Sequence, residues 1–164
     1  MKPPGKLDRI DIRILAELQR NGRITNTALA DAVGLSQSPC LQRLRRLEAS
    51  GVIRGYGVRL DVGRLADAIT VFTEVTLADH RREDFGTFES GIQRVPEVAE
   101  CHMVSGGYYY LLKVIARSVS DYQATMERVL DARIGIEKYF SYVVIKSPIG
   151  GRDVPIGRLL DTPD

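Results

Sequence analysis

Hydrophobic residues at the start of the chain recur with helical spacing. Between Asp8, which is a suitable N-cap, and about Arg20, they form a single stripe of Ile10, Ile14, Leu15 and Leu18. The pair Asn21-Gly22 then ends the pattern. The spacing predicts one amphipathic helix, which a following pair of short helices needs to complete a small core.

The stretch from Thr25 to Gly51 predicts two short helices joined by a tight turn. Thr25 is placed to cap the first helix, and Gly34 stops it where a positive φ is wanted. Ser36 is a good N-cap for the second helix, and Pro39 falls in its first turn, where a missing N–H costs nothing. The residues expected to face inward are Ala28, Leu29, Ala30, Val33, Leu35, Cys40, Leu44 and Leu47. This pattern indicates a helix-turn-helix, although periodicity alone also fits an ordinary helical hairpin with a solvated charged face.

The second of these helices leaves a polar and basic face outside. The expected outer residues are Gln37, Ser38, Gln42, Arg43, Arg45 and Arg46, with Arg54 after the helix. Such a face is typical of a helix that enters the major groove of DNA. We predict that Ser38, Gln42 and Arg43 reach base edges, and that the remaining arginines contact phosphates.

Beyond the helix-turn-helix, the apolar residues begin to alternate with polar residues and glycine. Tyr56, Val58 and Leu60 follow this period of two, which predicts a short strand suited to a wing or a bent connector. Residues 61–67 are expected to form a turn and a linker.

The second half of the chain switches between strand and helix periodicity. Strands are predicted over residues 68–77, 98–104, 108–116 and 138–146, and helices over 82–95 and 120–132, the latter opened by a capping box at Ser120–Gln123. The helix residues expected to be buried are Phe85, Phe88, Ile92, Val95, Tyr122, Met126, Val129 and Leu130. This order predicts an α+β protein whose second domain is a ferredoxin-like βαββαβ fold, an antiparallel sheet with two helices on one face.

The other face of this sheet is also predicted to be apolar. Its candidate residues are Phe72, Tyr109, Leu111, Ile115, Val143 and Ile145. Because an exposed patch of that size is a liability, we expect a homodimer that packs sheet on sheet. The last residues are rich in glycine and proline and are expected to form a loosely docked tail. The predicted domains are 1–60 for DNA, 61–67 as linker, 68–147 for sensing, and 148–164 as tail.

The charge distribution divides the chain in the same way. Residues 1–60 hold 11 Lys and Arg against 5 Asp and Glu, whereas residues 61–164 hold 12 against 16. A basic first half favours a nucleic-acid-binding domain joined to another module. No apolar run suits a membrane span or a signal peptide, so we expect a cytoplasmic protein. Cys40 and Cys101 lack the spacing of a disulfide framework or metal site, so two reduced, buried thiols and no metal or cofactor are expected.

Four segments of the chain together indicate a protein family far more specifically than a single helix-turn-helix does. They are LDRIDIRILAELQRNGRITNTALADAVGLS, SPCLQRLRRLEASGVIRGY, ECHMVSGGYYYLLKV and YVVIKS. In content and order they resemble the Lrp/AsnC, or leucine-responsive, family of transcription regulators. The resemblance implies an N-terminal winged helix-turn-helix on double-stranded DNA and a C-terminal effector-sensing domain. It also implies homodimers that assemble into octamers or larger discs, an amino acid bound between dimers, and control of amino-acid metabolism genes.

By the same resemblance, the effector cleft is lined by Met103, Gly106, Gly107, Tyr108, Tyr109, Val119, Tyr142, Val143 and Val144. The family's turn at this point usually reads Gly-Asp-X-Asp-Tyr, whereas here it reads Gly106-Gly107-Tyr108-Tyr109-Tyr110. The acid that matches Tyr109 is one the family commonly uses near the effector's amino group. Three alternatives follow: an amino acid held by another carboxylate such as Glu100, a keto acid or aromatic acid without an ammonium group, or no effector. The tyrosines also fit a purely structural role at an interface.

Other function classes stay open at this point. Relatives of this fold include haem-modifying decarboxylases, which need histidines and basic residues in the sensing domain, and the chain has only His80 and His102. Cys101 and His102 are neighbours on a predicted strand, so their side chains point to opposite faces and cannot act on one substrate. We therefore expect a regulator and not an enzyme. The remaining alternatives are an interaction module that does not bind DNA and a constitutive architectural DNA-binding protein without an effector.

Overall fold

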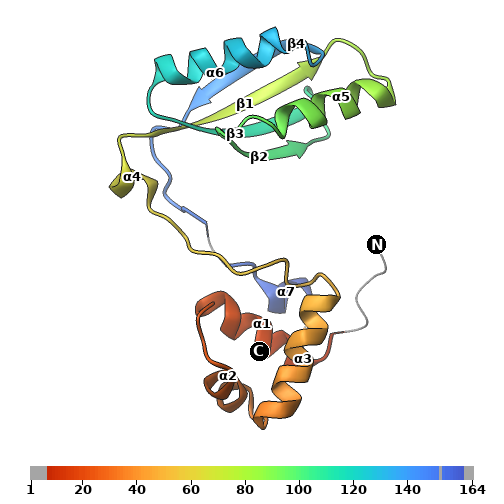
Figure 1. Cartoon of the computed structure of the whole chain (residues 1–164), viewed down its shortest axis with the longest axis vertical. Helices are drawn as coiled ribbons and strands as arrows, with labels where there is room; N and C mark the ends of the chain where they lie inside the picture. Colours follow the sequence, from red (N-terminus) through yellow and green to blue (C-terminus); the bar gives the residue numbers. More distant parts are fainter. Residues whose placement is uncertain (1–6, 152, 161–164) are drawn as a thin grey trace. The chain divides into compact units, whose positions relative to one another are not determined.

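The computed structural model describes residues 7–151 and 153–160, which form two compact units. One unit runs to Arg59 and also takes in the segment from Ile149 onwards, and the other is Leu60–Pro148 (Figure 1). Among the described residues, no helix is both long and apolar enough to cross a membrane.

The first unit is built on the helices α1 (Arg9–Arg20), α2 (Asn26–Val33) and α3 (Gln37–Ala49). Asp8 caps α1, the Thr25 hydroxyl accepts a hydrogen bond from the Ala28 N–H at the start of α2, and Gly34 ends α2 with φ of 73°. The predicted helices and these caps are confirmed. The buried side chains of the core come from all three helices: Ile14, Leu15, Leu29, Ala30, Val33, Cys40 and Leu47.

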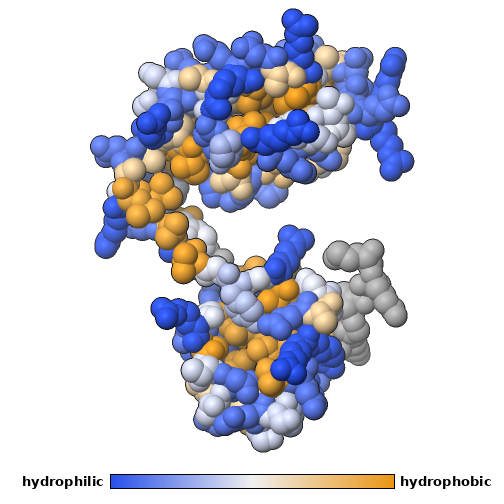
Figure 2. Space-filling view, in the orientation of Figure 1, coloured by the Kyte–Doolittle hydropathy of each residue, from blue (hydrophilic) through white to orange (hydrophobic). Residues whose placement is uncertain are grey.

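The strand predicted around Tyr56–Leu60 is wrong, because these residues form neither helix nor strand. Tyr56, Val58 and Leu60 are exposed, and so are the apolar side chains of Val62 and Leu65 in the short helix α4 (Val62–Leu65). Figure 2 shows this run of hydrophobic surface along the connecting segment. The alternation is real, but a strand also needs a neighbouring strand, and the described chain gives this segment none.

The segment after the sheet packs on the helix-turn-helix unit. Gln19 donates from Nε2 to the Val154 carbonyl at 3.1 Å, and Arg59 pairs with Asp153 at 2.5 Å. Ile156, which begins the short helix α7 (Ile156–Leu159), packs against the helical core. This placement was not visible in the sequence, where the segment shows no periodicity.

The second unit is a four-stranded antiparallel sheet in the order β2-β3-β1-β4. Its elements are β1 (Ile69–Leu77), α5 (Arg82–Ile92), β2 (Val98–Met103), β3 (Tyr110–Ala116), α6 (Val119–Asp131) and β4 (Ile136–Val143). The helices α5 and α6 cover one face of the sheet (Figure 1). The predicted ferredoxin-like arrangement is confirmed.

Burial on the helix-covered face follows the alternation along the central strands. Val71, Thr73 and Val75 of β1 are buried, and the Thr73 hydroxyl lies 2.8 Å from the Tyr122 hydroxyl of α6. Tyr122 also contacts the Ser141 hydroxyl at 2.5 Å, so this buried polar group is satisfied. Two details of α6 differ from prediction: Ser118 and not Ser120 is the N-cap, and Leu130 is exposed.

The open face of the sheet carries a mixed apolar surface. Phe72 lies opposite Tyr142, and Glu74 opposite Phe140, so their side chains share this face with Leu111 and Ile115. Three predicted members do not belong to it. Val143 lies opposite the buried Val71 on the helix side, Tyr109 packs against the core, and Ile145 lies beyond β4 with 99% of its surface exposed.

Candidate nucleic-acid interface and effector site

The start of α3 is fixed by contacts from α2. Asn26 donates from Nδ2 to the Gln37 carbonyl at 3.1 Å, and the Leu35 N–H donates to the Ala30 carbonyl at 2.9 Å. These bonds hold the turn between the two helices, with Leu35 packed against the core. The result is a rigid platform from which the outer face of α3 projects.

The exposed face of α3 is narrower than the sequence predicts. Ser38, Gln42 and Arg45 are exposed and follow one another at spacings of four and three residues, so they lie in one row along the helix. Their side chains make no hydrogen bond or ion pair within the described part of the chain, and Gln37 and Arg54 are exposed at either end of α3. This row offers free donors and acceptors of the kind that reads base edges.

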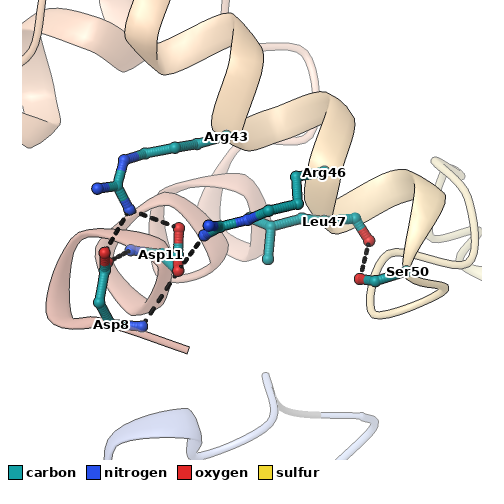
Figure 3. Close-up of polar contacts among 6 residues, drawn as sticks. All are labelled: Asp8, Asp11, Arg43, Arg46, Leu47 and Ser50. Atoms are coloured by element: carbon teal, nitrogen blue, oxygen red, sulfur yellow. Dashed lines mark hydrogen bonds and ion pairs between the residues drawn. The ribbon is translucent and has the colours of Figure 1, made fainter. Parts of the chain in front are cut away.

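Arg43 does not lie free on this face. Its Nη1 is 2.5 Å from Asp8 Oδ2 and 2.9 Å from Asp11 Oδ1, and only 26% of its side chain is exposed. Arg46, one turn further along α3, donates from Nη2 to Asp11 Oδ2 at 2.5 Å. We call Asp8, Asp11, Arg43 and Arg46 the α1–α3 clasp; Figure 3 shows the two arginines converging on the two carboxylates.

The carboxylates of the clasp also cap their own helix. The Asp11 N–H donates to Asp8 Oδ1 at 2.9 Å, and the Asp8 N–H donates to Asp11 Oδ2 at 3.1 Å, which is a reciprocal capping box. The Asp11 N–H and the Arg43 guanidinium hold the pKa of Asp8 below its ordinary value, and these acids raise the pKa of Arg43. The Asp11 side chain is fully buried, and its carboxylate accepts from Arg43, Arg46 and the Asp8 N–H.

The residues predicted to line the effector cleft fall into two groups. Met103, Gly106, Gly107, Tyr108 and Tyr109 lie at the β2–β3 turn, where Tyr109 N–H donates to the Val75 carbonyl near the end of β1. The second group lies near the other end of β1, where Val144 N–H donates to the Thr70 carbonyl; it comprises Val119, Tyr142, Val143 and Val144. Four residues of strand lie between Thr70 and Val75, so these two backbone contacts are roughly 17 Å apart. The side chains of the two groups come closer, because Tyr108 of the first group contributes, after burial and Glu74, to the raised pKa of Tyr142 in the second.

Two of the three tyrosines in the turn have defined intramolecular partners. The Tyr109 hydroxyl is 3.0 Å from His80 Nε2, and its ring packs edge-on against Phe85 at 5.7 Å between centroids. Tyr110 is buried, and its hydroxyl donates to Glu89 at 2.8 Å; burial and this carboxylate raise its pKa. Gly106 has φ of 151°, a conformation that favours glycine.

The carboxylate that the sequence suggested as another partner for an amino-acid effector has partners within the chain. Glu100 is already paired with Lys113 at 2.7 Å and with His102 at 3.3 Å, and Lys113 followed by His102 lowers its pKa. Cys101 lies opposite Leu112 and His102 opposite Leu111, so the two point to opposite faces of the sheet. The expectation that both thiols are buried is wrong for Cys101, which is exposed, whereas Cys40 is buried.

Comparison with known families agrees with this architecture. Residues 7–54 match a winged helix-turn-helix DNA-binding family, and residues 70–154 match the Lrp/AsnC ligand binding domain. The chain belongs to the Lrp/AsnC family. It is a DNA-binding transcription regulator with an effector-binding domain, as the four sequence segments predicted.

Individual members of the Lrp/AsnC family are similar over most of the chain. The transcriptional regulatory protein DoeX of Halomonas elongata is 46% identical over 142 residues, covering 87% of this chain and 90% of that protein. The leucine-responsive regulatory protein of Escherichia coli is 43% identical over 146 residues, covering 88% and 89%. A transcriptional regulator from Neisseria meningitidis, solved as an L-Met complex, superposes with a TM-score of 0.85 at 30% identity, covering 94% and 99%.

The α1–α3 clasp of this Lrp/AsnC chain was not predicted from its sequence. A signal was present, because two acids three residues apart open the first helix and two arginines three residues apart lie on α3. Such spacing places each pair on one helix face. What the sequence did not show is that the two faces meet.

Proposed function

We propose that α3 enters the major groove of DNA and reads base edges with the row Ser38, Gln42 and Arg45, flanked by Gln37. The observation that supports this is that the side chains of that row have no hydrogen bond or ion pair within the described residues, whereas Arg43 is bonded through Nη1 to Asp8 and Asp11. Arg46 and Arg54 then contact phosphates, and Arg43 holds α3 against α1 through its bonds to Asp8 and Asp11. The limits 1–60 and 68–147 remain our proposal for the two functional domains.

The test of this interface uses a duplex selected from a random library by the wild-type protein, and a scrambled duplex of equal length. Arg45→Ala is expected to cost about 1–3 kcal/mol on the selected duplex and much less on the scrambled one. Arg54→Ala is expected to weaken both equally and to lower the salt slope by about 0.9, the share of one phosphate. Identical behaviour of the two variants on both duplexes would contradict these roles.

We further propose that the open face of the sheet is a homodimer interface and that dimers assemble into octamers or larger. The exposed side chains on this face include Phe72, Phe140 and Tyr142. A folded domain rarely leaves an apolar patch of this kind exposed to solvent. Partial burial, followed by the neighbouring Glu74, raises the pKa of Tyr142 on this face. A stable monomer at micromolar concentration in sedimentation would contradict this proposal.

The effector is proposed to be an amino acid or a related keto or aromatic acid, bound between dimers, through which the protein controls amino-acid metabolism genes. Support comes from residues 70–154, which match the Lrp/AsnC ligand binding domain. It also comes from the L-Met complex of the Neisseria meningitidis regulator. The Gly106 and Gly107 N–H groups can receive a carboxylate, and Tyr108 or Tyr109 supplies an aromatic wall.

Calorimetry over the twenty amino acids and their keto acids tests the effector, with Tyr109→Asp as the partner variant. The lost-acid argument predicts weak binding of α-amino acids to the wild type and tighter binding to Tyr109→Asp. Micromolar binding of an ordinary amino acid by the wild type, not improved by the substitution, would refute the argument. No binding by either protein, with assembly intact, would leave the tyrosines a structural role and favour a constitutive DNA-binding protein.

The protein is proposed to act in the cytoplasm without enzymatic activity. The specific alternative is a haem-modifying enzyme on the same fold, and an absorbance spectrum of the purified protein tests it, since a bound tetrapyrrole absorbs strongly in the visible range. Salt-dependent retention on a duplex column separates a regulator from an interaction module that does not bind DNA.

A further inference from the structure

We propose that Asp11 is a positioning residue for DNA binding: from its buried site in α1 it holds the Arg46 guanidinium in a fixed orientation, from which Arg46 contacts a DNA phosphate. This inference rests on the proposed docking of α3 and extends it. It concerns a residue on a different helix, which the proposed interface does not touch.

Asp11 is held rigidly in its place. Its carboxylate is fully buried and accepts from Arg43 at 2.9 Å, from Arg46 at 2.5 Å and from the Asp8 N–H at 3.1 Å. Its place in the first turn of α1 and the core packing of that helix fix its backbone. A carboxylate held by three donors is a firm anchor for a flexible arginine.

Arg46 keeps hydrogen-bond donors that Asp11 does not occupy. Its side chain is 58% exposed, and its Nη2 bond to Asp11 is the only hydrogen bond it makes within the described residues. The guanidinium carries five N–H donors in a planar fork, and only Nη2 makes a hydrogen bond within the described residues, so donors remain for a further partner. Arg43, by contrast, is largely covered and bonded to both acids. Of the two clasp arginines, only Arg46 is therefore both held and available.

An Arg46 side chain that is already held by Asp11 loses less conformational entropy when it binds a phosphate. A free arginine loses much rotamer freedom when it orders on a phosphate, and one already ordered by a neighbour loses less. Lysine is a poorer replacement, because its ammonium group is a point charge on a flexible stem and lacks the rigid planar fork that presents one edge to Asp11 and another to a phosphate. The anchor thus converts an ordinary surface cation into a preorganised phosphate contact.

Two simpler accounts predict different results. If Asp11 acts only through its charge, its removal takes a negative charge away from the DNA-binding unit and tightens DNA binding. If it acts only on folding, its removal lowers the thermal midpoint but leaves the affinity of the folded fraction unchanged. Positioning alone predicts weaker binding by folded protein, and only while Arg46 is present.

The experiment measures dissociation constants on the scrambled duplex by fluorescence anisotropy, with the active fraction of the full-length protein set by stoichiometric titration. Arg46→Ala is expected to weaken binding about tenfold, and Arg46→Lys nearly as much. Arg54, which no described residue holds, is the matched comparison: Arg54→Lys is expected to keep most of the affinity that Arg54→Ala loses. Asp11→Asn is expected to weaken binding about fivefold alone and to add nothing to Arg46→Ala.

Wild-type affinity of Arg46→Lys would overturn the proposal, and this surface variant does so even if Asp11→Asn fails to fold. Tighter binding by Asp11→Asn, or an equal loss with and without Arg46, would also overturn it. If Arg45→Ala binds the selected duplex as the wild type does, and Arg54→Ala binds the scrambled duplex as the wild type does, the docking of α3 fails and the inference fails with it. Loss of affinity by Arg45→Ala on the selected duplex and by Arg54→Ala on the scrambled duplex, with wild-type binding by Arg46→Lys, refutes the inference alone.

Discussion

Replacing Arg43 with alanine separates the structural role of this residue from the base contact that the sequence suggested. The substitution removes the bonds to Asp8 at 2.5 Å and to Asp11 at 2.9 Å, while Asp11 keeps Arg46 and the Asp8 N–H. A charge-assisted bond to a buried carboxylate contributes about 1.5–3 kcal/mol, and the half-exposed pair with Asp8 adds at most about 1 kcal/mol. We expect Arg43→Ala to lower the free energy of unfolding of the helix-turn-helix unit by about 2–3 kcal/mol.

The assay is urea unfolding of the full chain, read by hydrogen exchange of the α1 and α3 amides so that the helical unit is followed by itself. Arg45→Ala is the matched control, since it removes an exposed arginine of the same helix that has no partner in the described part of the chain, and its effect is expected within about 0.5 kcal/mol. Equal effects of the two substitutions would refute the reasoning. Unchanged stability of Arg43→Ala together with relaxed base preference would restore the role predicted from sequence.

Other outcomes follow from individual contacts. Phe140→Lys on the open sheet face is expected to shift sedimentation toward the monomer, whereas Leu130→Lys on α6 is not. Asp8 has a lowered pKa in the folded state, so its contribution to stability is present at neutral pH and is lost as pH falls through that pKa, below about 4. The urea midpoint of Asp8→Asn is therefore expected to depend less on pH in this range than that of the wild type. Gly91→Ala would place a Cβ 2.5 Å from Ile134 Cγ2 and is expected to lower the thermal midpoint by overpacking worth about 1–3 kcal/mol.

The elements that the sequence predicted well are those decided by local patterns. Asp8, Thr25 and Gly34 act within one turn of their own helices, and the alternation along β1 reports burial on one face directly. The order of strands and helices then leaves few topologies for the second unit. These features depend on neighbours in sequence, which is why they were correct.

The features that the sequence missed depend on contacts between distant segments. Arg43 lies between the core row and the exposed row of α3, and only the approach of α1 decides that its guanidinium turns toward Asp11. Tyr56, Val58 and Leu60 alternate as a strand does, yet strand pairing is a property of two segments and not of one. The packing of the last segment against α1 also depends on contacts between distant residues. The Val154 carbonyl accepts a hydrogen bond from Gln19, and Ile156 packs against the helical core.

The central claim is that the exposed row of α3 reads DNA sequence. The most direct test is selection of preferred duplexes from a random library by wild type and by Gln42→Ala, whose substitution removes a free amide from the middle of that row. The account predicts that the preferred sequences differ at one or two base positions in each half-site and agree elsewhere. Identical preferences of the two proteins, at equal selection stringency, would contradict it.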